Sequence, residues 1–422
     1  MKGMDVPDAI QLMGDKQWQE IKSRLTGKFN KMMKGLFRQK GAQLDINILA
    51  SDEAQEFITT HAGILDGGFQ KVEMTDKMRE RLTRSNYIFS GIKTFHELNE
   101  AFPSMLDENG NKKPFERFLN DVQKINDTYN ANYLHAEYNF VQASATMAAK
   151  WEQFSEDGDR YNLQYRTAKD DKVRPEHAAL DGVTLPMSDS FWETYYPPNG
   201  WNCRCTVVQV RKQKYPATEH AEAMSRGEEA MNGERYNIFR FNSGKQGKTM
   251  PDYNPYTIKR CNDCDVAKGK LKLGFVPDYQ LCQGCIMIRK CSEDRNRDNS
   301  AKATKKSPEV KKLQGTTISN PDFNHEVLVT GGSIREWTNQ PHKEYAAKNS
   351  ILKHIAKVFR EAKYIGFIDN FKMKPGVKQS HLFETNVLGE LSWIIVREYE
   401  IGEFVLHSIS DSDKIKTGIR KE

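Results

Sequence analysis

The sequence predicts a multidomain α+β protein. Its 422 residues exceed the usual size of one domain, which is roughly 150 residues. The mean hydropathy of −0.74 is low, yet aromatic residues make up 10% of the chain, so we expect packed regions beside polar ones. The hydrophobic pattern also changes along the chain from helical to strand-like. We therefore expect an N-terminal helical bundle at residues 1–155, a small irregular β-rich domain at 156–215, a connector at 216–292, a basic linker at 293–314 and a C-terminal α+β domain at 315–422.

Charge and apolar content narrow the class of protein. The chain carries 63 basic and 57 acidic residues, a net charge of +6, which suits a nucleic-acid neighbour without requiring one. No stretch approaches the roughly eighteen apolar residues of a membrane helix, and residues 1–20 lack the pattern of a secretion signal. The seven cysteines then fit a reducing compartment better than a disulfide framework. We expect no membrane contact.

The first 150 residues have the pattern of packed helices. Apolar residues recur there at steps of three and four, as in Trp18, Ile21, Leu25, Phe29 and Met32. This spacing places them on one helix face, which is core in nearly every case. Residues 125–150 are predicted to form one long helix.

Short strand-like pieces with many turn residues follow from about residue 161. The strand candidates include residues 163–166 and 206–210, and the turns include Asp181-Gly and Pro197-Pro-Asn-Gly. The connector after residue 211 is polar, with one weak helix predicted at 218–231.

The connector ends in a cysteine pattern typical of zinc sites. Two Cys-x-x-Cys knuckles, separated by 17 residues, supply Cys261, Cys264, Cys282 and Cys285. Two such knuckles let four thiolates surround one ion tetrahedrally, so we expect a closed, structural zinc site. The alternative is four free thiols in a polar loop, but this segment has too few apolar residues to fold without a cross-link such as a bound metal ion. Cys291 would be a spare thiol.

The last 130 residues change from polar to amphipathic. Residues 289–312 hold nine Lys or Arg residues against four acids, a composition typical of a linker. Apolar residues at helical spacing then predict a helix ending near Ala362. Four strand candidates follow, at residues 364–371, 381–387, 391–398 and 403–410, and they predict a roughly four-stranded antiparallel sheet.

The β-rich segment carries three motifs in sequence: an Arg-x-x-His-x-x-Leu-x-Gly block at residues 174–182, the Pro-Pro-Asn-Gly turn from Pro197 and the pair Cys203 and Cys205. In their order and spacing these motifs resemble the Mu F-like family of phage head morphogenesis (minor head) proteins. The resemblance covers residues 85–210. It implies a minor head protein in the virion or procapsid, with the phage portal and other head proteins as partners, assembled in the bacterial cytoplasm.

Three residues of the same segment are candidate metal ligands. Cys203, Cys205 and His177 are of the types that bind zinc, and the two-residue offset puts both thiols on one face of a strand. Equally, Cys-Arg-Cys could open a buried strand while His177 is hydrogen-bonded locally. The sequence leaves both interpretations open.

The C-terminal domain contains Ser333-Ile-Arg-Glu-Trp337 and Gln340-Pro-His-Lys343, followed by the helix and the four strands. With this arrangement, residues 315–422 resemble the phage-borne nucleases of the barnase, EndoU, colicin and RelE-like superfamily. It implies a metal-independent RNase toxin that acts on RNA and is held in check by an immunity protein.

Cleaving RNA without a metal requires a base, an acid and a cation or hydroxyl near the phosphate. Histidine suits the first two roles, and arginine suits the third. The candidate catalytic residues are His342, His381, Arg397, His407 and Ser408, and we expect strand pairing to bring His381 and Arg397 into one cleft with His407 or Ser408. The alternatives are that each histidine is an ordinary strand residue, and that the domain is purely structural and binds a partner protein or nucleic acid without catalysis.

Overall fold

The computed structural model describes residues 15–260, 282–370 and 374–420. The chain divides into two compact units, Met1–Ser292 and Glu293–Glu422, and each is described by itself.

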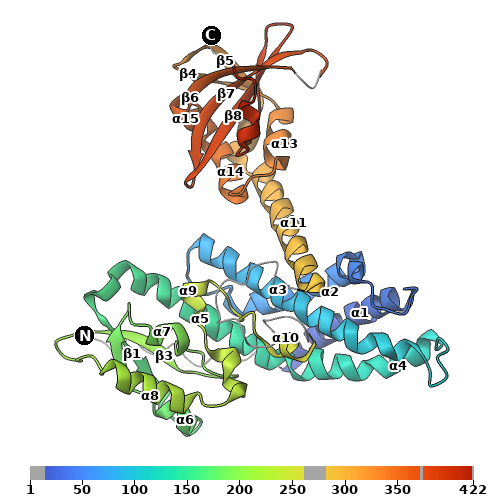
Figure 1. Ribbon diagram of the computed structural model, residues 1–422, viewed down its shortest axis with the longest axis vertical. Coiled ribbons are helices and arrows are strands. Elements are labelled where there is room, and N and C mark those ends of the chain that lie inside the picture. The colour runs from blue at the N-terminus through green and yellow to red at the C-terminus, as the bar shows by residue number, and fades with distance from the viewer. Residues whose placement is uncertain (1–14, 261–281, 371–373, 421–422) are drawn as a thin grey trace. The chain divides into compact units, whose positions relative to one another are not determined.

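The first half of unit 1 is a bundle of long helices (Figure 1). Ser51 and Thr75 cap two of them by accepting hydrogen bonds from the backbone N–H groups of Ala54 and Met78, which removes unsatisfied donors at the helix starts. The predicted helix at residues 125–150 is interrupted by a π-turn at Asp127–Asn132. The helices are α1 (Asp15–Phe37), α2 (Asp52–Asp66), α3 (Asp76–Ala101), α4 (Phe115–Asn126) and α5 (Leu134–Asp157).

The second half of unit 1 is a small antiparallel sheet with short helices. Its strand order is β2-β1-β3, formed by β1 (Asn162–Arg166), β2 (Thr184–Pro186) and β3 (Thr206–Val210). The buried Tyr196 donates from its hydroxyl to the carbonyl of Met147 in α5 at 2.9 Å, which fastens the sheet region to the bundle. The short helices are α6 (Pro175–Ala178), α7 (Phe191–Thr194), α8 (His220–Ala230), α9 (Ser243–Gln246) and α10 (Pro255–Arg260).

One hydrophobic core runs through unit 1. It includes Phe29 of the bundle, Trp192 of the sheet region and Cys285 of the connector. The three segments predicted as separate regions up to residue 292 therefore share a core.

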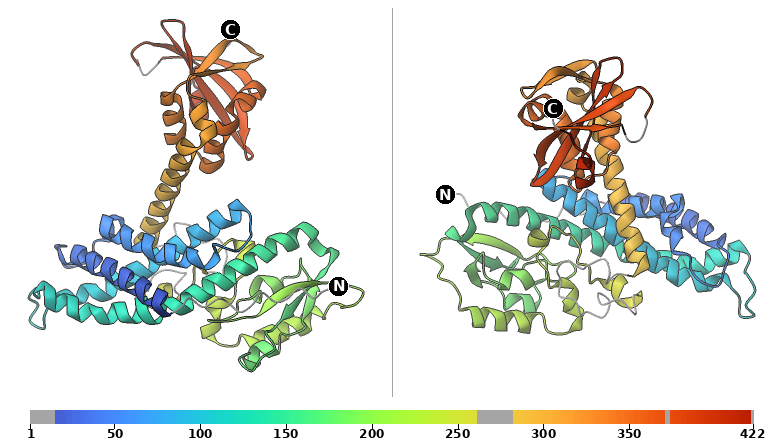
Figure 2. Two further views of the ribbon diagram at one scale, coloured as in Figure 1. Left: turned by 180° about the vertical axis from the view of Figure 1, so that it is seen from behind. Right: turned by 45° about the horizontal axis from the view of Figure 1, so that its top comes forward.

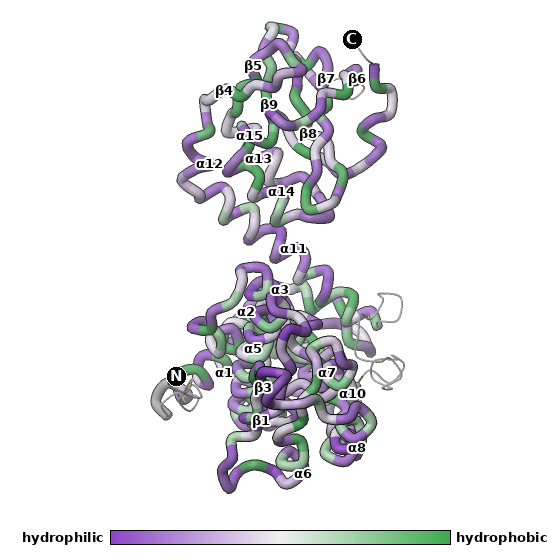
Figure 3. Tube along the Cα trace, turned by 90° about the vertical axis from the view of Figure 1, so that its left-hand side faces the viewer, coloured by the Kyte–Doolittle hydropathy of each residue, from purple (hydrophilic) through white to green (hydrophobic). Residues whose placement is uncertain are grey.

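The segment predicted as a basic linker is helical along most of its length. Helix α11 (Gln283–Lys306) continues to Lys306, and α12 (Pro308–Lys312) follows directly. Figure 3 shows that the residues of α11 are mainly hydrophilic. Ala301 and Val310 are nevertheless buried, so this segment packs where an unpacked chain was expected.

Unit 2 is a curled sheet with helices against one face (Figures 1 and 2). The strand order is β4-β5-β9-β8-β7-β6, antiparallel except for the parallel pair β5 and β9. The core lies between the sheet and the helices, where Trp337 and Phe359 meet Phe383 and Ile394. The elements are β4 (Thr316–Asn320), β5 (Phe323–Val329), α13 (Gly331–Asn339), α14 (Tyr345–Ile351), α15 (Ile355–Glu361), β6 (Lys363–Asp369), β7 (Val377–Val387), β8 (Glu390–Tyr399) and β9 (Phe404–Ser410).

The four strands predicted for this unit are present as β6 to β9, but the expectation of a four-stranded antiparallel sheet is wrong. The hairpin of β4 and β5 adds two strands, and β5 pairs in parallel with β9. Consecutive exposed residues, Thr316 and Thr317 in β4 and 324–326 in β5, interrupt the two-residue alternation that would mark these strands in the sequence. No helix in the described part of the chain is long and apolar enough to cross a membrane.

Candidate functional sites

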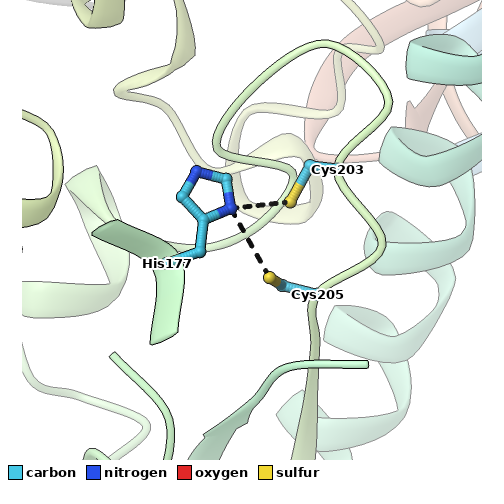
Figure 4. A group of neighbouring side chains, drawn as sticks. All are labelled: His177, Cys203 and Cys205. Atoms are coloured by element: carbon cyan, nitrogen blue, oxygen red, sulfur yellow. Dashed lines mark hydrogen bonds between the residues drawn. The ribbon is translucent and has the colours of Figure 1, made fainter. Parts of the chain in front are cut away.

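His177, Cys203 and Cys205 form a compact group at the start of β3. Figure 4 shows the His177 ring turned toward both sulfur atoms. Its Nδ1 atom lies 3.6 Å from the Sγ atom of Cys203 and 3.6 Å from that of Cys205. All three ligand atoms lie within 4.8 Å of one another. His177 and Cys203 are buried, and Cys205 is half-buried.

Local turns hold this group in place. Pro175 begins α6, which carries His177. Proline favours this position because its ring fixes the backbone angle φ near the helical value. The N–H of Cys203 donates to the carbonyl of Gly200 at 3.1 Å, which turns the chain toward β3. A side chain at Gly200 would place its Cβ 2.8 Å from the Arg174 guanidinium, which itself donates to the carbonyl of Trp201 at 2.6 Å.

The pKa values of the two thiols are shifted in opposite directions. A hydrogen bond from Cys205 and the neighbouring His177 hold the pKa of Cys203 well below its ordinary value, although burial opposes the shift. The hydrogen bond with Cys203 and burial raise the pKa of Cys205.

The four-cysteine zinc site is only half described. Cys261 and Cys264 lie outside the described residues. Cys285 is buried in the core of unit 1 and Cys282 is half-buried, both at the start of α11. The zinc site of these four residues stays a prediction.

In unit 2, strand register separates two of the predicted catalytic residues. Arg397 in β8 pairs with Ser380 in β7, and the neighbouring His381 pairs with Val396. Successive side chains of a strand point to opposite faces, so His381 and Arg397 lie on opposite faces of the sheet. The expectation that they share one cleft is wrong.

His381 lies on the buried face, between a carboxylate and a phenol. Its Nε2 atom is 3.0 Å from Glu398 Oε2, and its Nδ1 atom is 3.0 Å from the hydroxyl of Tyr364. The side chain is 2% exposed, and the ring of Phe323 packs 4.8 Å from the imidazole. Burial alone would raise the pKa of Glu398, but hydrogen bonds from Lys378 and His381 outweigh it and lower that pKa.

Arg397, His407 and Ser408 are on the other face of the sheet. Ser408 pairs with Ile395, which shares the face of Arg397, but its side chain is buried. Burial, and then the positive charges of Arg397 and Lys374, lower the pKa of His407 to about 4. His407 is therefore neutral at pH 7 and has cations beside it.

His342 stands apart from both groups. Its Nε2 atom is 2.9 Å from Ser392 Oγ, and its Nδ1 atom accepts a hydrogen bond from the backbone N–H of Glu344. The side chain is nearly buried, and burial lowers its pKa. These contacts occupy both ring nitrogens, so local bonds hold the ring of this predicted catalytic residue in place.

The helical bundle contains a buried ionic network that was not predicted from the sequence. The ammonium of Lys93 in α3 donates to Glu137 Oε2 in α5 at 2.8 Å and to the carbonyl of Tyr129 at 2.7 Å, and it lies 3.0 Å from His61 Nε2. Tyr256 donates its hydroxyl to the other oxygen of Glu137. All these side chains are buried.

Burial and charge set the acidity of the network. Burial and Lys93 lower the pKa of His61 to about 4. Burial would raise the pKa of Glu137, but Lys93 and His61 outweigh it and hold that pKa at about 2. Burial raises the pKa of Glu97 to about 8. Charged residues inside long helices were the available signal, but spacing alone does not distinguish a buried charge from a solvated one.

Comparisons with known proteins identify two segments of the chain. Residues 108–208 match the family described as Phage Mu protein F like protein. Residues 296–406 match the family described as Large polyvalent protein-associated domain 3. No solved structure matches the chain.

Two curated proteins resemble parts of this chain. The protein called "Putative capsid assembly protein F" of Escherichia phage Mu is 36% identical over 104 residues, which are 24% of this chain and 21% of that protein. The "Mu-like prophage FluMu F protein" of Haemophilus influenzae is 25% identical over 198 residues, which are 46% of this chain and 42% of that protein. The chain thus spans less than half the length of either relative. The Mu F-like resemblance seen in the sequence is confirmed for this segment, and the nuclease resemblance stays a prediction.

Proposed function

We propose that this chain is a minor phage head protein that acts in procapsid assembly, with the portal and other head proteins as partners. The match of residues 108–208 to the Mu F-like family carries the proposal. One relative of that segment is named for capsid assembly. The chain would act in the bacterial cytoplasm during assembly and remain in the virion.

The fold of the matched segment suits a structural role in the head. Residues 108–208 run through α4, α5 and the three short strands, whose side chains enter the core of unit 1. Tyr165 of β1 donates to Asn199 at 2.8 Å, and Tyr196 bonds to α5, so buried contacts bind the long helix to the sheet region. Such a segment can present a fixed surface to a neighbouring head protein.

The test is deletion and complementation in a phage that encodes this chain. Deletion should abolish infectious heads, and residues 1–292 supplied from a plasmid should restore them, because unit 1 holds the Mu F-like segment and its own core. Residues 293–422 alone should fail. Normal head yield after deletion would refute the assembly role, and rescue only by the full chain would show that unit 2 is needed as well.

A second candidate function concerns unit 2, which would be a metal-independent RNase toxin with an immunity protein as partner. The supporting observation is that Arg397 and Lys374 lie close enough to His407 to help burial lower its pKa to about 4, so a neutral imidazole has cations near it at pH 7. A neutral imidazole can take the proton of a ribose 2′-OH, and the cations can stabilise the charged phosphorane. His381, on the opposite face, would support the sheet and take no part in the chemistry. The alternative is a binding domain without catalysis.

RNA integrity in bacteria that express the full chain distinguishes these alternatives. An RNase should degrade cellular RNA and arrest growth, and His407→Asn should abolish both effects. His354→Asn, an exposed histidine of the same unit, is the matched control and should leave them unchanged. Intact RNA with soluble wild-type protein would leave the binding domain as the role of unit 2.

A further inference from the structure

We propose that His177, Cys203 and Cys205 bind one Zn²⁺ ion, which fastens α6 to the start of β3. The ion would be separate from the one predicted for the four cysteines of the connector. Imidazole nitrogen and thiolate sulfur are the preferred ligands of zinc in proteins. The proposal rests on the geometry of the three ligand atoms.

The distances between the ligand atoms fit a shared tetrahedral ion. With zinc bonds of about 2.3 Å to sulfur and about 2.05 Å to nitrogen, a tetrahedral angle separates nitrogen from sulfur by about 3.6 Å. The Nδ1 atom of His177 lies 3.6 Å from each sulfur. The same bonds separate two sulfur atoms by about 3.8 Å, and the three ligand atoms lie within 4.8 Å of one another. Small side-chain movements complete the site.

Hydrogen bonding alone explains this arrangement less well. In either tautomer the Nδ1 atom makes one in-plane hydrogen bond, since it has either one N–H or one lone pair, so it can satisfy only one of the two sulfur atoms well. Here both sulfur atoms lie at the same 3.6 Å from Nδ1. One ion on that lone pair would satisfy both sulfur atoms together.

Charge and burial favour a divalent ion. His177 is 2% exposed and Cys203 is 5% exposed, so an uncompensated thiolate there would be costly. Two thiolates and Zn²⁺ sum to zero charge, which removes this cost. Because Cys205 is half-buried, water can reach the fourth position of the ion.

The ion would close a loop of the Mu F-like segment. His177 and Cys203 are 26 positions apart, and both Pro197-Pro-Asn-Gly and the short β2 lie between them. This part of unit 1 has short strands and many turns. An ion that joins its two ends would stabilise the loop by restricting the unfolded chain.

Zinc content of the purified full-length protein tests the proposal. The variant Cys282→Ser/Cys285→Ser removes ligands of the predicted connector site and should retain about one zinc per chain. Adding Cys203→Ser/Cys205→Ser should remove that zinc, whereas adding Cys291→Ser, the matched control, should not. Less than about a tenth of an equivalent in the first variant, or unchanged zinc after the second pair, would overturn the proposal.

Cobalt binding gives a result that does not depend on folding of the Cys203 and Cys205 variant. Metal-free Cys282→Ser/Cys285→Ser protein titrated with Co²⁺ should develop a thiolate-to-cobalt charge-transfer band and the strong visible absorption of tetrahedral cobalt, saturating near one equivalent. Excess zinc should erase both. A titration without the charge-transfer band would exclude thiolate ligation at this site and would refute the proposal.

Discussion

The substitution Lys93→Met tests how much the buried network contributes to the stability of unit 1. The Lys93 and Glu137 side chains are 0% and 3% exposed, and the ammonium bonds to the carboxylate at 2.8 Å. Removing the ammonium leaves a buried carboxylate without its main counter-charge. Breaking a buried pair from one side costs about 3–5 kcal/mol, so we expect a loss of that size.

The charge argument also predicts a rescue. Lys93→Met/Glu137→Gln removes both charges, and the amide of Gln still accepts from Tyr256 and can donate to His61. The double variant should therefore regain most of the stability that Lys93→Met loses. The control Lys28→Met breaks a partly exposed pair with Glu56 in the same bundle and should change stability much less than Lys93→Met.

Hydrogen exchange followed by mass spectrometry in increasing urea is the assay, because it reports each unit of the full chain separately. Peptides from α3 and α5 should lose protection in Lys93→Met, and peptides from β7 and β8 should not. Equal effects of Lys93→Met and Lys28→Met, or a double variant less stable than Lys93→Met, would refute the reasoning.

Three further predictions concern pH and packing. Burial raises the pKa of Glu97 to about 8 from an ordinary 4.5, so between these pH values folded unit 1 holds a proton that the unfolded chain has lost, and its stability should fall as pH rises from 4.5 to 8. Glu97→Gln should flatten that decline in urea titrations at several pH values. Burial lowers the pKa of Lys348 to about 7 from 10.5, so between these pH values the unfolded chain binds a proton that folded unit 2 does not. The stability of unit 2 should therefore rise from pH 7 to 10.5, and Lys348→Met should remove this rise. Gly227→Ala in α8 would place a Cβ 2.5 Å from the Tyr195 ring and should lower the free energy of unfolding by about 1–3 kcal/mol. Gly27→Ala in α1, with nothing within 4 Å of the new Cβ, should not lower it. Thermal unfolding compares the two variants.

The sequence predicted side-chain faces well where periodicity was strong. Leu25, Phe29 and Met32 of the predicted stripe are fully buried. In unit 2 the predicted strands at residues 381–387 and 391–398 lie within β7 and β8. Local periodicity determines these features, and a sequence displays it directly.

Relations between distant segments were beyond such patterns. Whether His381 and Arg397 meet depends on the register of β7 against β8, and a shift of one residue reverses the answer. Lys93 and Glu137 are 44 positions apart and meet only because α3 packs near α5. His177 and the two cysteines were proposed together because their residue types suit zinc, and only the structure shows that one nitrogen faces both sulfur atoms.

The separate cores of the two units make the proposed functions separable by mutation. Among the described residues, the core of unit 1 ends with Ile288 and the core of unit 2 begins with Val310. A substitution that perturbs one core therefore changes no buried apolar contact of the other. If head assembly depends on the Mu F-like segment and RNA cleavage on His407, Gly227→Ala should lower head yield without changing RNA cleavage. His407→Asn should abolish RNA cleavage without changing head yield. Loss of both activities from either substitution would show that the units depend on each other.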